Sequence, residues 1–393
     1  MQRNTMWSLS VALGMFLVGI LFSASNHAVL AQDERKREKL GSSLERLKWD
    51  KEKGEAVEKE PKARTRKKSA TAGDEDVLRI ETTMAVFDLL VADRHGRPVS
   101  GLKKEDFVVV EDGVPQQLGA FTLGNNAELG RSIVLIIDYS GSQLPFLRTS
   151  IAAAKTLVDQ LGPKDKMAVV TDDVTLLTDF TADKPKLKAE LDQLQQKAFA
   201  KKKFGRSRQF SALFAVLREL VVEEERPIII FQTDGDQLPY LQPFTPPPPP
   251  FKVLPAMAVK FGLADIIAAA QREHTTIYSV ISEERLLGRP SAKPSGGTGQ
   301  TLEEIIAGLV LRAQKALVEV AAGSGGWHEF LERPEQAAAI YAKILDDINR
   351  RYVIGYYPTN EVRDGKLRKV RFEIRGHPEY VIVGRRAYYA AQP

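Results

Sequence analysis

The chain has 393 residues, which allows two or three domains, and its 56 basic and 51 acidic residues give a formal net charge of +5. It contains no cysteine, which excludes disulfides, thiolate metal sites, a cysteine nucleophile and a lipid-modified N-terminal cysteine. The composition is otherwise that of an ordinary globular protein with a sizeable core.

The first 31 residues have the pattern of a secretory signal. Arg3 supplies the positive charge, Ser8–Ala24 forms the apolar segment, and Val29–Ala31 offers small or aliphatic residues for cleavage before Gln32. An uncleaved membrane anchor is the alternative, because the apolar run is long for a signal. No later stretch of the sequence is apolar for long enough to span a bilayer. The pattern predicts export to the periplasm, the cell envelope or the extracellular space.

Residues 32–76 are dense in Lys, Arg and Glu, which predicts a charged, disordered tether. Leu40, Leu44 and Leu47 share one helical face, so a short amphipathic helix is expected inside it. The basic cluster Lys62–Lys68 is interpreted as a solvated segment, with contact to an anionic envelope surface as the alternative. Nucleic acid is not expected as a partner, because the chain is exported and no aromatic residues interleave with these charges.

Small β segments are predicted at both ends of the remaining chain. Within residues 77–124, strands are expected over Thr83–Val91, over Phe107–Glu111 and around Gln117–Leu123, with turn signals between them. Residues 326–393 predict a helix over Pro334–Arg351 followed by strands from Tyr352 onward. Each flank is too small to build a core alone, so we expect the two to pair.

Strands and helices alternate through the central region, residues 130–325. The aliphatic run Ile133–Ile137 predicts a strand buried on both faces. Further strands are predicted over Asp165–Val170, Pro227–Gln232 and Thr276–Ile281, and helices over Leu147–Leu161, Pro185–Leu194, Ser211–Val222, Ala256–Glu273 and Thr301–Ala322. This alternation predicts a doubly wound, mostly parallel α/β sheet. Two proline-rich insertions, Thr245–Pro250 and Pro290–Gly299, are interpreted as linkers or as a rim that contacts a partner.

Oxygen-bearing side chains follow two of the predicted strands. Ile133–Ile137 is followed by Asp138, Ser140 and Ser142, and the strand that starts at Pro227 ends before Asp234. In open α/β sheets the carboxyl edge is where ligands bind. Carboxylates and hydroxyls without Cys or His suit a hard cation such as Mg²⁺. The sequence therefore predicts a metal site at this edge.

At these residues the chain resembles the von Willebrand factor type A domain. The metal-ion-dependent adhesion site of that family has D-x-S-x-S after the first strand, a Thr from a middle loop and an Asp after the fourth strand. Asp138, Ser140, Ser142 and Asp234 match three of these elements. The flank Val86–Phe121 and the C-terminal motifs Tyr352–Pro358, Asp364–Lys366 and Tyr388–Ala390 resemble bacterial exported von Willebrand factor A-related proteins. The resemblance implies a non-catalytic adhesion or protein-binding module. It also implies Mg²⁺, Mn²⁺ or Ca²⁺ with one open position, which an acidic side chain of a protein partner fills.

The sequence departs from this family at the Thr ligand. The aligned residue is Ser207, and Thr181 is the alternative. Lys201–Lys203, Arg206 and Arg208 surround Ser207, and cations at this place oppose metal binding. One alternative function is therefore a metal-free scaffold that binds anionic partners through this basic loop.

A serine hydrolase is the second alternative, with Ser140 or Ser142 as the nucleophile. The sequence has no G-x-S-x-G elbow and no His with an evident route to either serine. It also lacks the G-x-x-x-x-G-K-[ST] loop of nucleotide hydrolases. We therefore expect a protein that is not an enzyme.

Overall fold

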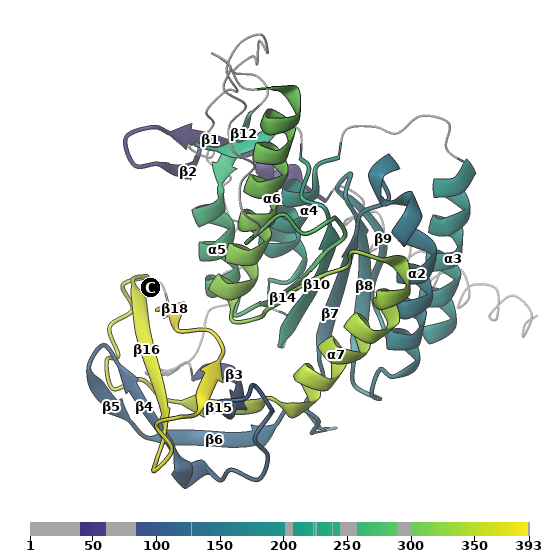
Figure 1. Cartoon of the computed structure of the whole chain (residues 1–393). Helices are drawn as coiled ribbons and strands as arrows, with labels where there is room; N and C mark the ends of the chain where they lie inside the picture. Colours follow the sequence, from purple (N-terminus) through teal and green to yellow (C-terminus); the bar gives the residue numbers. More distant parts are fainter. Residues whose placement is uncertain are drawn as a thin grey trace, which may run out of the picture.

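An α/β domain and a β sandwich make up most of the described part of the chain (Figure 1). The computed structural model describes residues 40–59, 84–126, 128–200, 207–222, 224, 226–237, 239–243, 258–288 and 301–391. The signal segment, the basic cluster Lys62–Lys68 and both proline-rich insertions lie outside the described residues, so their predictions stay predictions. Within the described ranges, no helix combines the length and apolar character needed to cross a membrane.

The α/β domain is built on a six-stranded sheet with the order β14-β13-β10-β7-β8-β9. Its strands are β7 (Ser132–Ile137), β8 (Lys166–Thr171), β9 (Thr175–Thr181), β10 (Pro227–Thr233), β13 (Thr276–Ile281) and β14 (His328–Phe330). All neighbours are parallel except β9, which runs antiparallel to β8. The predicted doubly wound, mostly parallel sheet is confirmed. Its order reverses between β7 and β10, which makes this pair the topological switch point.

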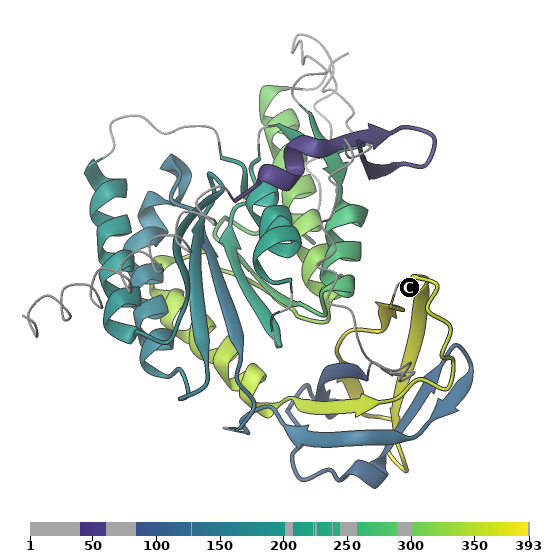
Figure 2. The ribbon, with the colours of Figure 1, turned by 180° about the vertical axis from the view of Figure 1, so that it is seen from behind.

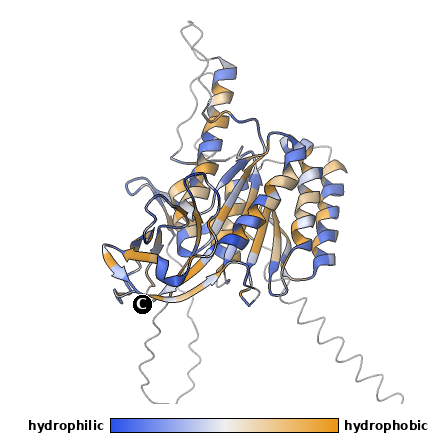
Figure 3. Ribbon diagram, turned by 60° about the horizontal axis from the view of Figure 1, so that its bottom comes forward, coloured by the Kyte–Doolittle hydropathy of each residue, from blue (hydrophilic) through white to orange (hydrophobic). Residues whose placement is uncertain are grey.

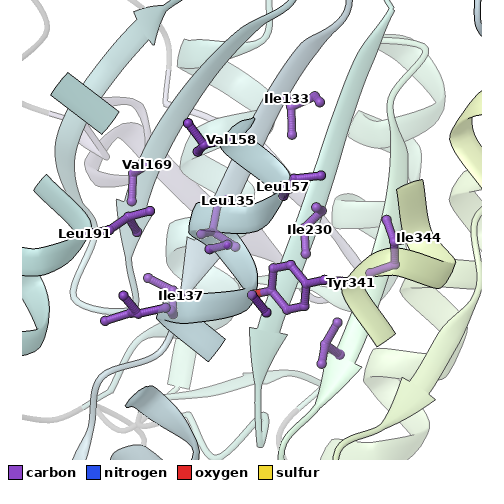
Figure 4. Packing of buried hydrophobic residues seen from close by; sticks show 14 of the residues in the cluster. Ile133, Leu135, Ile137, Leu157, Val158, Val169, Leu191, Ile230, Tyr341 and Ile344 are labelled. Carbon is purple, nitrogen blue, oxygen red and sulfur yellow. The ribbon is translucent and has the colours of Figure 1, made fainter. Parts of the chain in front are cut away.

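Helices cover both faces of this sheet. One face carries α2 (Leu144–Asp159), α3 (Lys184–Ala200) and α7 (Ala337–Arg350). The other carries α4 (Gln209–Ala215) with its π-helical turn η4 (Val216–Leu220), α5 (Leu263–Arg272) and α6 (Leu302–Ser324). Successive side chains of a strand point to opposite faces, so Ile133, Leu135 and Ile137 pack under α2 and α7 (Figure 4) while Val134 and Ile136 enter the opposite core. Two-sided burial explains why the central strands are almost continuously apolar (Figure 3).

Two boundaries of the central domain differ from the sequence prediction. The helix expected over Ala256–Glu273 begins only at Leu263, because residues 258–262 form strand β12, which pairs in parallel with β11 (Tyr240–Gln242). Gly262 then ends the strand and caps α5, with its N–H donating to Asp265 Oδ2 at 2.7 Å. At the other end the domain does not stop at residue 325, because β14 extends the sheet and α7 covers it.

Residues 40–59 are folded, which corrects the predicted tether over this part of 32–76. They form the 3₁₀ turn η1 (Ser42–Arg46) and the hairpin β1 (Leu47–Asp50) and β2 (Glu55–Glu58), which packs against the α/β domain beside β12 (Figure 2). Leu47 is 1% exposed within the core on the α4 side, and the N–H groups of Gly41 and Ser43 donate to the Glu219 carboxylate at 2.8 and 2.7 Å. The leucines do face the protein core, but they belong to a turn and a hairpin and not to the expected amphipathic helix.

The two flanking segments build one β sandwich, as their small size led us to expect. One antiparallel sheet has the order β17-β3-β15-β6 and the other β18-β16-β4-β5. The N-terminal flank supplies β3 (Ala85–Ala92), β4 (Phe107–Glu111), β5 (Val114–Gln116) and β6 (Leu118–Leu123), and the C-terminal flank supplies β15 (Tyr352–Tyr356), β16 (Leu367–Ile374), β17 (Val381–Val383) and β18 (Ala387–Tyr389). The inner faces of both sheets share one core, with Phe87 and Tyr356 among its largest side chains.

A buried arginine fastens the sandwich to the α/β domain. Arg351 follows α7 directly, and its Nε donates to Asp347 Oδ2 at 2.8 Å. Its Nη1 donates to the carbonyl oxygens of Asp88 in β3, at 3.2 Å, and Gly325 after α6, at 2.9 Å. The sandwich therefore adjoins the end of the domain where β7 begins, and the carboxyl edge of the sheet faces away from it (Figure 1).

Candidate functional site

The tips of β7 and β10 lie side by side at the switch point of the sheet. Ile137 pairs with Gln232, and the N–H of Asp138 donates to the carbonyl of Gln232 at 3.0 Å. Asp138 and Asp234 therefore leave neighbouring strands at the same edge. Gly235 follows with a left-handed φ of +79°, and a Cβ there would lie 3.1 Å from that of Ala313 in α6, so a glycine lets the chain turn close to this helix.

One hydrogen-bonded network contains four of the five predicted site residues. Ser142 Oγ donates to Asp234 Oδ2 at 2.6 Å, and the Oγ atoms of Ser140 and Ser142 are 3.2 Å apart. The N–H of Ser140 donates to Asp138 Oδ1 at 2.9 Å. The structure thus brings together two carboxylates and two hydroxyls that come from the ends of two strands.

Ser207 lies outside this network of four. Its Oγ donates to Asp172 Oδ2 at 2.5 Å, and the other oxygen of Asp172 accepts the N–H of Tyr139 at 3.2 Å. Ser207 is therefore separated from the network by a further carboxylate. Thr181 pairs with Met167 near the start of β8, which places it toward the opposite edge of the sheet and removes it as the alternative ligand. Of the five cations around Ser207 only Arg208 is described, and its Nη2 donates to the carbonyl of Asp173 at 2.6 Å.

Two glutamine amides complete the site, and sequence reasoning missed both. Gln209, the first residue of α4, donates from Nε2 to Asp138 Oδ2 at 2.9 Å, to Asp234 Oδ1 at 3.3 Å and to the carbonyl of Asp236 at 3.1 Å. Gln143 donates from Nε2 to Asp234 Oδ2 at 2.9 Å. The Oε1 atom of each amide is buried and has no hydrogen-bond partner among the described residues. Gln143 ends the 3₁₀ turn Gly141–Gln143 directly before α2, and Gln209 begins α4, but nothing in the sequence distinguishes these two glutamines from others at helix starts.

Negative charge concentrates at this edge. Burial raises the pKa of Asp138 to about 7, and the neighbouring carboxylates of Asp172 and Asp234 add to the rise. Burial, with the charge of Asp234, also raises the pKa of Asp236 and of Glu283 above their ordinary values. Within the described ranges, no Lys or Arg forms a salt bridge with Asp138, Asp234 or Asp236. A bound cation would relieve the cost of ionising this cluster.

The donor set fits a hard divalent cation. Ser140, Ser142, Asp138 and Asp234 offer only oxygen atoms. Oxygen-only sets of this kind suit Mg²⁺, Mn²⁺ or Ca²⁺. The described residues hold no cluster of three or more His, Cys, Asp and Glu side chains arranged as a metal site, so any ion here depends on the hydroxyls.

A pocket of about 600 Å³ opens next to these side chains. Ser142 and Asp234 line it, together with Leu309 and Ala313 of α6 and Leu241 of β11. Asp234 and Asp236 therefore line a largely apolar pocket, whereas Asp138 is 1% exposed and does not line it.

The network contains no histidine among the described residues. His274 contacts Arg385 next to the sandwich, and His328 lies in the edge strand β14. Neither contacts Ser140 or Ser142, so the geometry offers these serines no general base of the usual kind. The described geometry gives the hydrolase alternative no support.

Comparison with known proteins gives matches among solved structures only. No family model matches the chain, and no curated protein matches it. Similar structures include the vWF domain of the type V pili tip protein Mfa5 from Porphyromonas gingivalis, at 15% identity and a TM-score of 0.38 over 56% of this chain and 95% of that one. The conserved hypothetical protein BatB from Bacteroides thetaiotaomicron is similar at 17% identity and a TM-score of 0.34, over 56% and 98%. Manganese-loaded TRAP protein from Plasmodium vivax is similar at 13% identity and a TM-score of 0.33, over 73% and 100%.

The fold class rests on the sheet itself. The α/β domain has the features that the resemblance to the von Willebrand factor A domain implied: a mostly parallel six-stranded sheet, helices on both faces, D-x-S-x-S after β7 and an Asp after β10. The predicted α/β architecture is thereby confirmed by the sheet order and the helices on both faces.

Proposed function

We propose that this chain is an exported, non-catalytic adhesion module that binds a divalent cation at the carboxyl edge of its sheet and, through it, an acidic side chain of a protein partner. The observation that carries the proposal is the single network formed by Asp138, Ser140, Ser142 and Asp234 at the switch point. Mg²⁺ is the ion we expect, with Mn²⁺ and Ca²⁺ as substitutes.

When bound, the cation supplies a positive centre with an open position for a carboxylate. Asp138 and Asp234 provide the negative charge that holds it, and the hydroxyls of Ser140 and Ser142 provide neutral oxygen donors, so some positive charge remains to attract a partner. Gln143 holds the Asp234 carboxylate in place. Ser207 supports the site indirectly, because it fixes Asp172 beside Asp138.

Export follows from the signal pattern of residues 1–31, with the periplasm, the envelope or the extracellular space as the destination. In such a location the binding edge, which lies at the end of the α/β domain away from the sandwich, would be free to meet a partner. The basic cluster Lys62–Lys68 offers a second, weaker contact to anionic envelope surfaces.

A metal-free scaffold is the second candidate, and one contact favours it. Gln209 donates to both Asp138 and Asp234, so the two carboxylates are compensated in part without any ion. In this reading the basic loop that includes Arg208 would bind an anionic partner, and binding would weaken with salt but not with a chelator.

Calorimetry with Mn²⁺ and Mg²⁺ tests the proposal on the metal-free protein, its Asp138→Ala variant and an Asp93→Ala control in a surface turn of the sandwich. We expect binding to the wild type and the control and none to Asp138→Ala. Equal heats from all three proteins would contradict the proposal. A pull-down from the native envelope with and without EDTA then separates metal-dependent adhesion from the scaffold.

A further inference from the structure

The side-chain amide of Gln209 occupies the space between the two carboxylates of the site. Its Nε2 lies 2.9 Å from Asp138 Oδ2, 3.3 Å from Asp234 Oδ1 and 3.1 Å from the carbonyl oxygen of Asp236. Three acceptors from two strand tips therefore converge on one donor group. The amide NH₂ points its two hydrogens, which carry partial positive charge, toward these negative or partly negative oxygen atoms. A bound cation would attract the same oxygen atoms.

The amide and a divalent cation exclude each other at this position. Mg²⁺ requires oxygen ligands at about 2.0–2.1 Å, and Ca²⁺ at about 2.3–2.6 Å. An ion that takes Asp138 Oδ2 and Asp234 Oδ1 as ligands would meet Nε2, which bonds to these two oxygens and whose hydrogens carry positive charge. Gln209 must therefore leave, or turn its amide over, when an ion binds these two oxygens.

The structure shows that the amide is held by its donor side only. Gln209 is 1% exposed, yet its Oε1 accepts no hydrogen bond from any described residue. Buried polar atoms are usually paired, so an unpaired oxygen in a packed site needs an explanation. If the amide moves away, it therefore loses only the hydrogen bonds from its Nε2 to the site, because its oxygen makes none with the described residues.

We propose that Gln209 is an internal competitor of the cation: its amide substitutes for the ion when the site is empty and lowers the affinity of the site for that ion. The inference rests on the proposed function, because it concerns the same carboxylates. It makes the empty site stable and sets the ion concentration at which the site fills. Adhesion would then occur only where divalent cations are abundant.

Gln209→Met tests this inference, because methionine keeps the length and volume of the side chain but offers no donor to the carboxylates. Gln232→Met is the matched control: Gln232 is also a buried amide of the same domain, but its side chain bonds to Ser150 and Tyr341 on the other face of the sheet. The measurements are the dissociation constant of Mn²⁺ by calorimetry and the melting temperature without metal.

We expect Gln209→Met to melt at a lower temperature than the wild type without metal and to bind Mn²⁺ at least about tenfold more tightly, since hydrogen bonds to charged groups must no longer be broken. Gln232→Met should also melt earlier but bind Mn²⁺ as the wild type does. If Gln209→Met does not fold without metal, Gln209→Ser, which admits water to the carboxylates, replaces it in the same comparison.

The outcomes separate this inference from the proposed function. Wild type that binds Mn²⁺, with Gln209→Met binding it equally or more weakly, overturns the competitor role alone and makes the amide oxygen a ligand. Absence of binding to wild type, with tight binding to Gln209→Met, supports the competitor role most strongly. Absence of binding to every variant overturns both.

Discussion

The buried carboxyl of Asp138 should make the metal-free protein less stable as the pH rises. Asp138 is 1% exposed, and burial, followed by the charges of Asp172 and Asp234, raises its pKa from 3.8 to about 7. Between pH 4 and 7 the folded state therefore holds this proton while the unfolded state has lost it. Stability falls with pH wherever the folded state binds more protons. The difference between 3.8 and about 7 corresponds to roughly 4 kcal/mol, which is the upper limit of the loss of unfolding free energy over this window.

Urea denaturation of metal-free wild type and Asp138→Asn at pH 4, 5.5, 7 and 8 measures this effect. The asparagine does not titrate, so the unfolding free energy of wild type minus that of the variant should fall by up to about 4 kcal/mol from pH 4 to pH 8. Asp93→Asn is the control. Hydrogen bonds from Arg97 lower the pKa of Asp93 to about 2, so its contribution is complete above pH 4 and the difference from wild type should stay constant.

Parallel curves for wild type and Asp138→Asn from pH 4 to 8 would refute the reasoning. They would mean that the site solvates or pairs the Asp138 carboxylate far better than its burial indicates. Saturating Mn²⁺ adds a second check, because an ion that compensates the carboxylates should abolish most of the pH dependence of wild type and leave Asp138→Asn unaffected.

Three further predictions concern stability. Arg351→Met should lower the unfolding free energy in urea by about 3–5 kcal/mol, because the Asp347 carboxylate is left buried without its cation. Adding Asp347→Leu should restore part of this loss. If the two losses simply add, the buried pair does not contribute as described. Leu47→Ala should cost about 2–5 kcal/mol and speed proteolysis within residues 40–59, and unchanged cleavage would show that the hairpin does not depend on this contact. Tyr388→Phe should cost about 1–3 kcal/mol in urea, since Glu111 then keeps Tyr356 as its one phenol donor among the described residues, and an unchanged midpoint would contradict this.

The buried parallel strands were predictable from the sequence almost to the residue. β7 and β10 are covered on both faces, and this burial accounts for their aliphatic runs Ile133–Ile137 and Ile228–Ile230; β13 is also fully buried but carries Tyr278 and Ser279. β12 and the hairpin of residues 47–58 were not predictable in this way. The turn before β1 depends on Glu219, far along the chain, and β12 depends on pairing with the short strand β11. No local pattern records such contacts.

The candidate site divides along similar lines. Asp138, Ser140, Ser142 and Asp234 follow from the rule that strand ends meet at one edge, and the same rule applied to the strand that ends at Thr171 would have found Asp172. The amides of Gln143 and Gln209 carry no such signal. A glutamine at the start of a helix is commonplace, and its role depends on which carboxylates the fold places opposite it.

The pairing of β15 between β3 and β6 has a consequence for the order in which the chain is completed. The N–H of Leu102 bonds to the phenol oxygen of Tyr352, 250 residues later, and β3 and β6 both pair with β15. During synthesis, the first strands of the sandwich must wait with open edges until the whole α/β domain has been made. Formation of strands β15 to β18, residues 352–389, therefore completes the sandwich. A protease that trims them would release a chain with its six-stranded sheet formed and an unclosed, aggregation-prone flank.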